Sequence, residues 1–596
     1  MFFSFPFPFF KSKAREEEEE KAHLSSLSLP PLSPLPKQTA PAMGATKQDT
    51  ARLVSTIFLA SGLITLLQTY FGDRLPIIQG GSFAYIAPVL AIARDVQARP
   101  GSSWKTQPFE GEIIRDHARF LATIREVSGA VIASSLLIFL IAFTGLLGLI
   151  LPFISPITVA SNIAVVGLAL YSSGIPAASS CWPLSMSSLC LLIFFSQYLR
   201  KVSLPKIGRV FETIPVVLTL AVVWPAAAIA TAAGAWGPAG AVRENDLASL
   251  NPATLNCRVD VAEDGLLKST PLFAAPPYPM QFGLPIFTAS GTIVMLGGAL
   301  AAFVESLGDY YAAARISGAP VPPPAAVSRA VLFQGIGCAV AGLFGTGSGT
   351  TAYNENLAAM AITRVASRRV ARAAGLWLLV LGGLSPKFGA LLASIPPPLF
   401  AGLFCVLFGL IAATGISVFQ HADMSSSRNL LILGVSIYLG LSTPAYAEDK
   451  KFASNGGPVS TSSAAVNSAI NGILKSGATV ALIVSLFLDT TIPTTHAEER
   501  GLGAWHASRD LMSKWWEDEK VAAVYALPWG LSQKFGELRL RVRGEVGRFG
   551  SRALERVRGG CGGGGREKKK KKEEEAEVEA TVAAAATRRE GGGSAV

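Results

Sequence analysis

The sequence predicts an all-α polytopic membrane protein. Half of the 596 residues are hydrophobic, only 16% are charged, and the mean hydropathy is +0.41. A water-soluble domain of this size could not bury so much apolar surface in one core. Apolar runs long enough to cross a bilayer recur along the chain, and short charged loops separate them. We therefore expect the chain to span a membrane many times.

The chain contains about thirteen apolar segments, several of them too short to span alone. They lie at about Leu53–Phe71, Leu75–Ala93, Val127–Phe153, Ile157–Tyr171, Pro183–Tyr198, Ile214–Ala235, Ser290–Tyr311, Val331–Phe344, Asn354–Ile362, Ala371–Ile395, Leu399–Val418, Asn429–Leu441 and Ile473–Leu488.

Two of these segments are broken. Gly80 and Gly81 interrupt Leu75–Ala93, and a Gly/Thr-rich stretch precedes the short Asn354–Ile362. Transporters with internal inverted repeats place discontinuous helices at matching positions in their two halves. Irregular backbone at bilayer depth is tolerated where protein or a water-filled cavity satisfies it. The sequence thus predicts an inverted-repeat transporter with two short strand and half-helix elements, and a binding site where they meet.

Basic loops predict the orientation. By the positive-inside rule, the C-terminus and three basic loops are cytoplasmic. The basic residues are Arg200, Lys201, Lys206 and Arg209 in the first loop, Arg315 and Arg329 in the second, and Arg364, Arg368, Arg369 and Arg372 in the third. The loops Arg94–Glu126, Trp236–Ala289 and Ser442–Gly472 are then external.

The ends differ from the transporter domain, which we place at residues 51–490. Residues 1–50 are expected to be disordered, 491–535 to form a cytoplasmic segment, and 536–596 to be a low-complexity tail rich in Arg, Gly, Lys, Glu and Ala. The tail is either solvated or binds anionic membrane lipid. The ends carry part of the net charge of +11, and the rest is spread over the loops of the membrane domain, so that charge does not indicate nucleic-acid binding.

The cysteines and histidines show no pattern of a disulfide framework, a metal site or a nucleophile with its base. We expect no enzyme activity, no metal and no cofactor.

Acids within apolar segments indicate the chemistry instead. Glu305 and Asp309 are four residues apart and so share one helix face. Two carboxylates facing one cavity cannot both ionise freely, which suits proton binding. In an alternative interpretation, Asp309 only pairs with Arg315 or caps a neighbouring helix.

A second pair of polar residues, Glu355 and Asn356, opens the short segment after the Gly/Thr stretch. Asn is also a common helix cap, so an ordinary turn is the alternative. A helix start can nevertheless bind polar ligand groups through its free N–H groups.

The stretch Glu355–Arg364 resembles the signature of the nucleobase–ascorbate transporter family, in which an acid or Gln and an Asn are followed by any residue, Gly, four more residues, Thr and Arg. The resemblance extends from about Ala51 to Phe535 and is closest to plant members. It also takes in Leu66–Pro76, Gly80–Tyr85, Phe303–Asp309, Leu343–Gly349, Thr363–Arg369, Lys387–Pro396 and Trp515 through Pro528.

The resemblance implies two inverted repeats of seven segments, divided into a core and a gate domain, and a homodimer formed through the gate. It implies proton-coupled uptake of xanthine, uric acid and related purines, or uracil, across the plasma membrane. By motif position, Glu305 and Glu355 would bind the base, Ser82 and Phe83 would line the site, Asn356 would tune transport, Asp309 would take part in coupling, and Thr363 and Arg364 would influence specificity.

The chain departs from the family pattern in three ways. The signature Gly is Ala358, the resemblance stops after Phe535, and residues 1–50 lack the full apolar segment that precedes the one at Leu53 in family members. The last departure leaves a truncated, non-transporting or regulatory member as an alternative. An anion transporter of the sulfate or bicarbonate type is another, although two acids facing the ligand disfavour it.

Overall fold

The structure, a computed structural model, describes most of the predicted membrane domain. The described residues are 34–99, 112–144, 146–147, 153–202, 210–236, 256–259, 266–273, 275–353, 356–357, 360, 365–449, 451–452, 457–494, 499–501 and 519–527. The predicted tail at 536–596 lies outside them.

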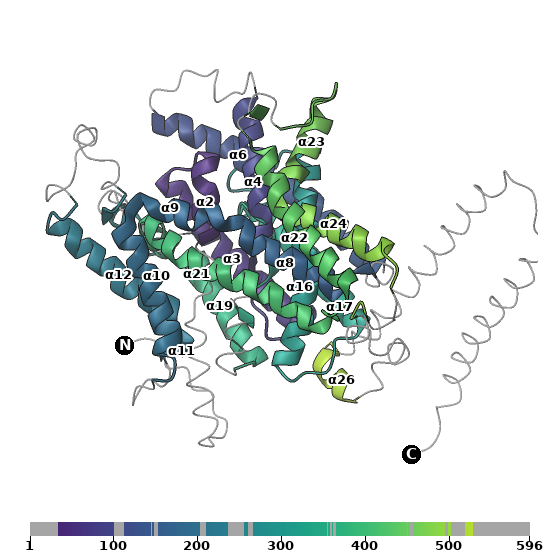
Figure 1. The fold of residues 1–596 in the computed structure, drawn as a ribbon. Coiled ribbons are helices and arrows are strands. Elements are labelled where there is room, and N and C mark those ends of the chain that lie inside the picture. The colour runs from purple at the N-terminus through teal and green to yellow at the C-terminus, as the bar shows by residue number, and fades with distance from the viewer. Residues whose placement is uncertain are drawn as a thin grey trace, which may run out of the picture. The chain divides into compact units, whose positions relative to one another are not determined.

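Helices make up most of the described chain (Figure 1). The first half contains α2 (Pro34–Met43), α3 (Lys47–Phe71), β1 (Gln79–Gly81), η1 (Phe83–Tyr85), α4 (Ile86–Ala98), α6 (Glu112–Phe143), α8 (Pro156–Ala169), η3 (Leu170–Ser173), α9 (Ile175–Ala178), η4 (Ser179–Cys181), α10 (Trp182–Ile193), η5 (Phe194–Tyr198), α11 (Val210–Thr213) and α12 (Pro215–Ala232). The second half contains α15 (Leu266–Ser269), α16 (Ala289–Ile316), α17 (Pro324–Phe344), β2 (Thr350–Ala352), α19 (Arg368–Leu384), α20 (Pro386–Ala393), α21 (Pro397–Val418), η7 (Phe419–His421), α22 (Ser427–Ala447), α23 (Ala464–Lys475), α24 (Gly477–Thr491) and α26 (Glu519–Tyr525).

Eight of the described helices are long and apolar enough to cross a membrane, or up to nine if a bent pair counts as one span. That pair is α19 and α20, which meet at 90°. The apolar helices α8 and α24 are shorter. The prediction of an all-α polytopic membrane protein is therefore confirmed. The helices that are long enough to cross a membrane are fewer than the apolar segments predicted from the sequence, because several of those segments form half-helices or bent helices.

Helical structure begins earlier than the sequence predicted. Residues 1–50 were expected to be disordered, but α2 covers Pro34–Met43 and α3 begins at Lys47. Thr46 and Asp49 form a capping box, in which the Asp49 N–H donates to the Thr46 hydroxyl at 3.2 Å. Met43 is fully buried. Burial of such residues offsets the poor helix propensity of the three prolines in α2.

The helices form two packed groups. In the first, the core, α3 packs against α17, α19 and α20, and α6 packs against α16 and α17. In the second, the gate, α21 packs against α8 and α10, and α24 packs against α8 and α22. Figure 1 shows α8, α21 and α22 running close to one another. The core helices approach closely through small residues: a Cβ at Gly62 of α3 would lie 2.5 Å from the Gly375 carbonyl of α19.

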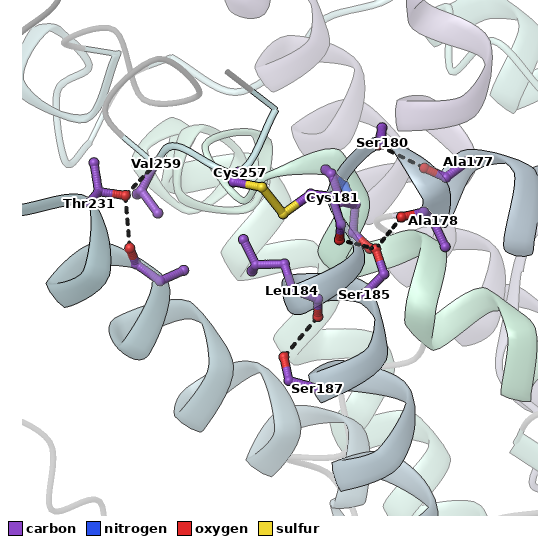
Figure 2. The surroundings of a disulfide bond; sticks show 12 residues. Ala177, Ala178, Ser180, Cys181, Leu184, Ser185, Ser187, Thr231, Cys257 and Val259 are labelled. Carbon is purple, nitrogen blue, oxygen red and sulfur yellow. Dashed lines mark hydrogen bonds between the residues drawn. A yellow bond between two sulfur atoms is a disulfide. The ribbon is translucent and has the colours of Figure 1, made fainter. Parts of the chain in front are cut away.

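A disulfide joins Cys181, at the start of α10, to Cys257 (Figure 2). The sequence-based prediction that the cysteines form no disulfide is therefore wrong for this pair. The two residues lie 76 positions apart, so their spacing gave no signal. The same segment reaches α12, because the Val259 N–H donates to the Thr231 hydroxyl at 3.3 Å. Disulfides persist in oxidising compartments, which agrees with an external position for this loop.

Candidate functional site

The two short strands meet inside the core and pair antiparallel. Gln79 lies opposite Ala352, and Gly81 lies opposite Thr350. The Thr65 hydroxyl of α3 accepts from the Gln79 N–H at 2.9 Å and donates to the Gln79 carbonyl at 3.3 Å. This pairing satisfies backbone groups that could not be left bare at bilayer depth. The predicted strand and half-helix elements are thereby confirmed for the first half, and β2 confirms the strand of the second.

A helix start follows β1 directly. Ser82 is the cap of η1: its hydroxyl accepts from the Ala84 N–H at 3.2 Å, and its own N–H donates to the Gly349 carbonyl at 3.1 Å. The buried Tyr85 ring crosses the backbone at Gly349, where a Cβ would lie 2.2 Å from the ring. Only glycine fits at this crossing. Ser82, a predicted site residue, thus lies where the first half-helix meets the second strand.

Phe83, the next predicted site residue, links the core to the gate. Its ring packs edge-on against Phe408 of α21, with centroids 5.2 Å apart and an angle of 86° between the planes. Phe408 in turn stacks on Phe404 at 5.1 Å. A flat ligand beside Ser82 would therefore meet aromatic side chains from both helix groups.

The two predicted acids, Glu305 and Asp309, lie in α16, and both are buried. Ser306 holds this part of α16 to β2: its hydroxyl lies 2.7 Å from the Thr351 hydroxyl and accepts from the Ala352 N–H at 3.2 Å. Glu305 is the neighbour of this anchor, so its backbone is fixed beside the paired strands. Because α16 is helical throughout, the acids share one face, as predicted.

The alternative partner of Asp309, Arg315, lies near the end of α16. Its guanidinium is 3.0 Å from the His421 ring nitrogen Nε2. The role of Asp309 remains a prediction.

Of the second polar pair, the structure describes Asn356. Its N–H donates to the Tyr353 carbonyl at 3.2 Å, and its side-chain amide donates to the Pro76 carbonyl at 3.1 Å. Asn356 therefore ties the segment after β2 to the segment before β1. The other predicted residues of the signature, Glu355, Thr363 and Arg364, lie outside the described residues, as does Ala358.

Two buried amide side chains were not singled out by sequence. Gln79 of β1 is completely buried, and within the described chain neither of its side-chain polar atoms has a hydrogen-bond partner. Asn162 of α8 donates from its amide to the Ala301 carbonyl of α16 at 3.0 Å, and its amide oxygen has no partner among the described residues. Polar residues inside apolar segments are often functional. That signal was available in the sequence, since Asn162 interrupts Ile157–Tyr171 and Gln79 precedes the glycine pair.

The arrangement suits a small, flat, polar ligand. Backbone groups at a helix start, buried amides and carboxylates supply hydrogen bonds, and phenyl rings supply a stacking surface. Among the described residues, no group of three or more His, Cys, Asp and Glu side chains could hold a metal ion.

The chain resembles known transporters in sequence over most of its length. The sequence profile of the Permease family matches residues 34–448. The chain is 36% identical over 502 residues to Nucleobase-ascorbate transporter 1 of Arabidopsis thaliana, covering 84% of this chain and 91% of that protein. It is also 36% identical over 482 residues to Solute carrier family 23 member 2 of Homo sapiens, covering 78% of this chain and 70% of that protein.

A solved structure, the transmembrane domain of the cyanobacterial bicarbonate transporter BicA, aligns with a TM-score of 0.40 and 16% sequence identity over 73% of this chain and 97% of that one. The family assignment rests on the sequence matches alone. The chain is a membrane transporter and not an enzyme, and it belongs to the nucleobase–ascorbate transporter family.

Proposed function

We propose that the protein takes up nucleobases, with xanthine and uric acid as the leading substrates and uracil as a further candidate, together with protons. The observation that carries the proposal is the position of Glu305. It is buried in α16, beside the Ser306 anchor that holds this helix to the paired strands. The relatives named as nucleobase–ascorbate transporters support this substrate class.

Binding of the base follows from its donors. A purine or pyrimidine presents ring N–H groups, and an ionised carboxylate accepts them in charge-assisted hydrogen bonds about twice as strong as neutral ones. In this proposal Glu305 and Glu355 accept such bonds, and the backbone at Ser82 contacts the rim of the base. The Phe83 ring covers its face.

Coupling rests on the paired acids. Glu305 and Asp309 are one helical turn apart in a buried environment, where two negative charges oppose each other. A proton entering with the base relieves this repulsion. Return of the empty protein then requires the proton to leave, which couples the two fluxes.

Ascorbate is the competing substrate, because the relatives' names include it. Ascorbate is an anion at neutral pH, and Glu305 and Glu355 would oppose it in the site. Xanthine and uracil are largely neutral at this pH and meet no such repulsion, so we favour nucleobases. Urate is itself an anion, so in this proposal it enters only when the accompanying proton neutralises one of the acids. A non-transporting member of the family is the remaining alternative.

We further propose that the protein is a homodimer in the plasma membrane, joined through the gate. Large apolar side chains of α10 and α12 face outward, such as Trp182 at 48% and Ile229 at 70% exposure. Such residues suit lipid or a second copy of the chain.

Uptake in a host strain without nucleobase carriers tests the proposal. We expect the full chain to take up labelled xanthine, unlabelled uric acid to compete, and ascorbate in excess to compete weakly. Uptake should rise as the external pH falls from about 7.5 to 5.5 and should collapse with a protonophore. Uptake driven by sodium, or a preference for ascorbate, would refute the proposed coupling or substrate. Surface-expressed protein without any uptake would favour the non-transporting alternative.

A further inference from the structure

An acid outside the predicted site is the most unusual polar group of the core. Asp73 lies two residues beyond the last residue of α3, in the connection to β1, and it is 2% exposed. This connection lies on the side that the positive-inside rule assigns to the cytoplasm. One carboxylate oxygen, Oδ1, accepts from the Leu75 N–H at 2.8 Å. The other, Oδ2, is buried and has no hydrogen-bond partner in the described part of the chain.

Arg329, whose charge acts on Asp73, does not hold the second oxygen. Arg329 of α17 donates from Nε to the Gly72 carbonyl at 2.8 Å and from Nη2 to the Tyr525 carbonyl of α26 at 2.7 Å. Arg329 thus ties the start of the Asp73 connection to α26. Its charge acts on Asp73 from a distance. A buried carboxylate without a paired cation is costly, whereas a neutral carboxyl group needs no counter-charge.

The electrostatics agree with a neutral carboxyl. Burial raises the pKa of Asp73 from 3.8 to about 8, although the Leu75 N–H and the Arg329 charge oppose the shift. The stability of the buried arrangement is therefore full below pH 3.8, decreases as the pH rises above that value and is lost as the pH rises through about 8. Groups from four helices face Asp73: Gln68 of α3, Tyr310 of α16, Arg329 of α17 and Tyr525 of α26. Arg74, the residue after Asp73 in the chain, faces Arg368 and Arg372 of α19.

A chain of hydrogen bonds connects Asp73 to the paired strands. The Asp73 N–H donates to Gln68 Oε1 at 3.3 Å, and the Gln68 amide lies 3.4 Å from the Tyr310 hydroxyl. That hydroxyl donates to Gln334 Oε1 at 3.4 Å, and Gln334 Nε2 donates to the Thr350 carbonyl of β2 at 3.4 Å. Glutamine amides do not readily pass on protons. The chain can therefore transmit a change of position, and the proton of Asp73 must exchange with water at the cytoplasmic side.

From this geometry we infer that Asp73 is a second proton-binding site of the transporter, which releases its proton to the cytoplasm. In the release step the Oδ2–H bond breaks, and the proton passes to cytoplasmic water. The resulting carboxylate lies near Arg329. Since Arg329 also holds Gly72 and α26, the new charge alters the packing of the connection that leads into β1. This inference rests on the proposed proton coupling and adds to it a residue from outside the signature motifs.

The variant Asp73→Asn tests the inference, because its amide oxygen can still accept from the Leu75 N–H but cannot lose a proton. Asp423→Asn is a matched control: Asp423 makes the same local bond, to the Ser425 N–H at 2.9 Å, but is exposed. In proteoliposomes with the full chain, labelled xanthine uptake is measured while the internal pH is set from about 6.5 to 8.5 at constant external pH. We expect net uptake by wild type and Asp423→Asn to rise about tenfold over this range, and uptake by Asp73→Asn to change less than about twofold, with xanthine exchange preserved.

A wild-type pH profile in Asp73→Asn would overturn the inference. A measurement that needs no transport separates this outcome from failure of the proposed function. Infrared titration of the purified protein should show a carboxylic acid band that is lost around pH 8 in wild type and Asp423→Asn, and that is absent from Asp73→Asn. If the three titrations are the same, Asp73 is an ordinary turn residue. If the band behaves as expected but wild type carries no base, the proton site stands and the proposed substrate falls.

Discussion

Replacement of Glu305 by alanine is expected to abolish nucleobase uptake while leaving the protein at the cell surface. Glu305 is buried beside the Ser306 anchor of α16. Loss of a charge-assisted hydrogen bond to the base costs about 1.5–3 kcal/mol, or roughly ten- to 150-fold in affinity, and the coupling group is lost as well. Initial rates of labelled xanthine uptake, normalised to surface protein, measure the effect.

Glu305→Gln separates the two roles of this residue. The amide oxygen still accepts a hydrogen bond, so exchange of external for internal base should persist, whereas proton-driven net uptake should fall by at least about tenfold. Glu126→Gln is the control. Glu126 is another buried glutamate, but it lies midway along α6 and bonds to Arg99 and Thr288. Its ratio of net uptake to exchange should match wild type. An unchanged ratio in Glu305→Gln would remove Glu305 from the coupling step.

Replacement of Asp489 by alanine is expected to lower the stability of the protein more than any other substitution proposed here. Asp489 is completely buried at the end of α24 and pairs with Arg428 at 2.9 Å and with Arg500 at 2.7 Å. Its removal leaves two buried or half-buried guanidinium groups without their anion. Breaking a buried pair in this way costs about 3–5 kcal/mol. The melting temperature of the purified protein in detergent, followed as loss of the monodisperse chromatographic peak after heating, should therefore be clearly lower than that of wild type.

Asp449→Asn provides the contrast. Asp449 pairs with Lys451 at 3.9 Å, but both side chains are exposed. An exposed pair contributes about 0–1 kcal/mol, so its melting temperature should stay near that of wild type. Asp489→Asn should fall between the two, because its amide oxygen can still accept one guanidinium bond. Equal melting of Asp489→Ala and Asp449→Asn would show that the buried network contributes nothing measurable.

Sequence patterns predicted those parts of the fold that depend on residues close together in the chain, namely the helices and the break before η1. Apolar runs located the helices, and the pair Gly80–Gly81 located the break before η1, because glycine permits irregular backbone that an apolar helix excludes. The strand register, with Gln79 opposite Ala352, was not predictable. It depends on Thr65 of α3 and Ser306 of α16, two helices that are far apart from each other in the sequence.

The same limit applies to the polar groups that sequence reasoning missed. Cys181 at the start of α10 and Cys257 in the loop after α12 form a disulfide, and nothing in their spacing of 76 residues indicates a pair. Asp73 reads in the sequence as a polar residue at the end of a span. Its burial results from packing against α16, α17 and α26, three elements remote in the chain. The acids of α16 were predictable because charge inside an apolar run is costly and so marks a function.

Proton movement driven by substrate is the decisive test of proton-coupled nucleobase uptake. Purified protein is reconstituted with a pH-sensitive dye inside the vesicles, at equal pH on both sides and without sodium, and xanthine is added outside. We expect the lumen to acidify as xanthine enters, and Glu305→Gln to exchange xanthine without acidification. Entry of xanthine with no change of lumenal pH, or entry that requires a sodium gradient, would contradict proton-coupled nucleobase transport by this protein.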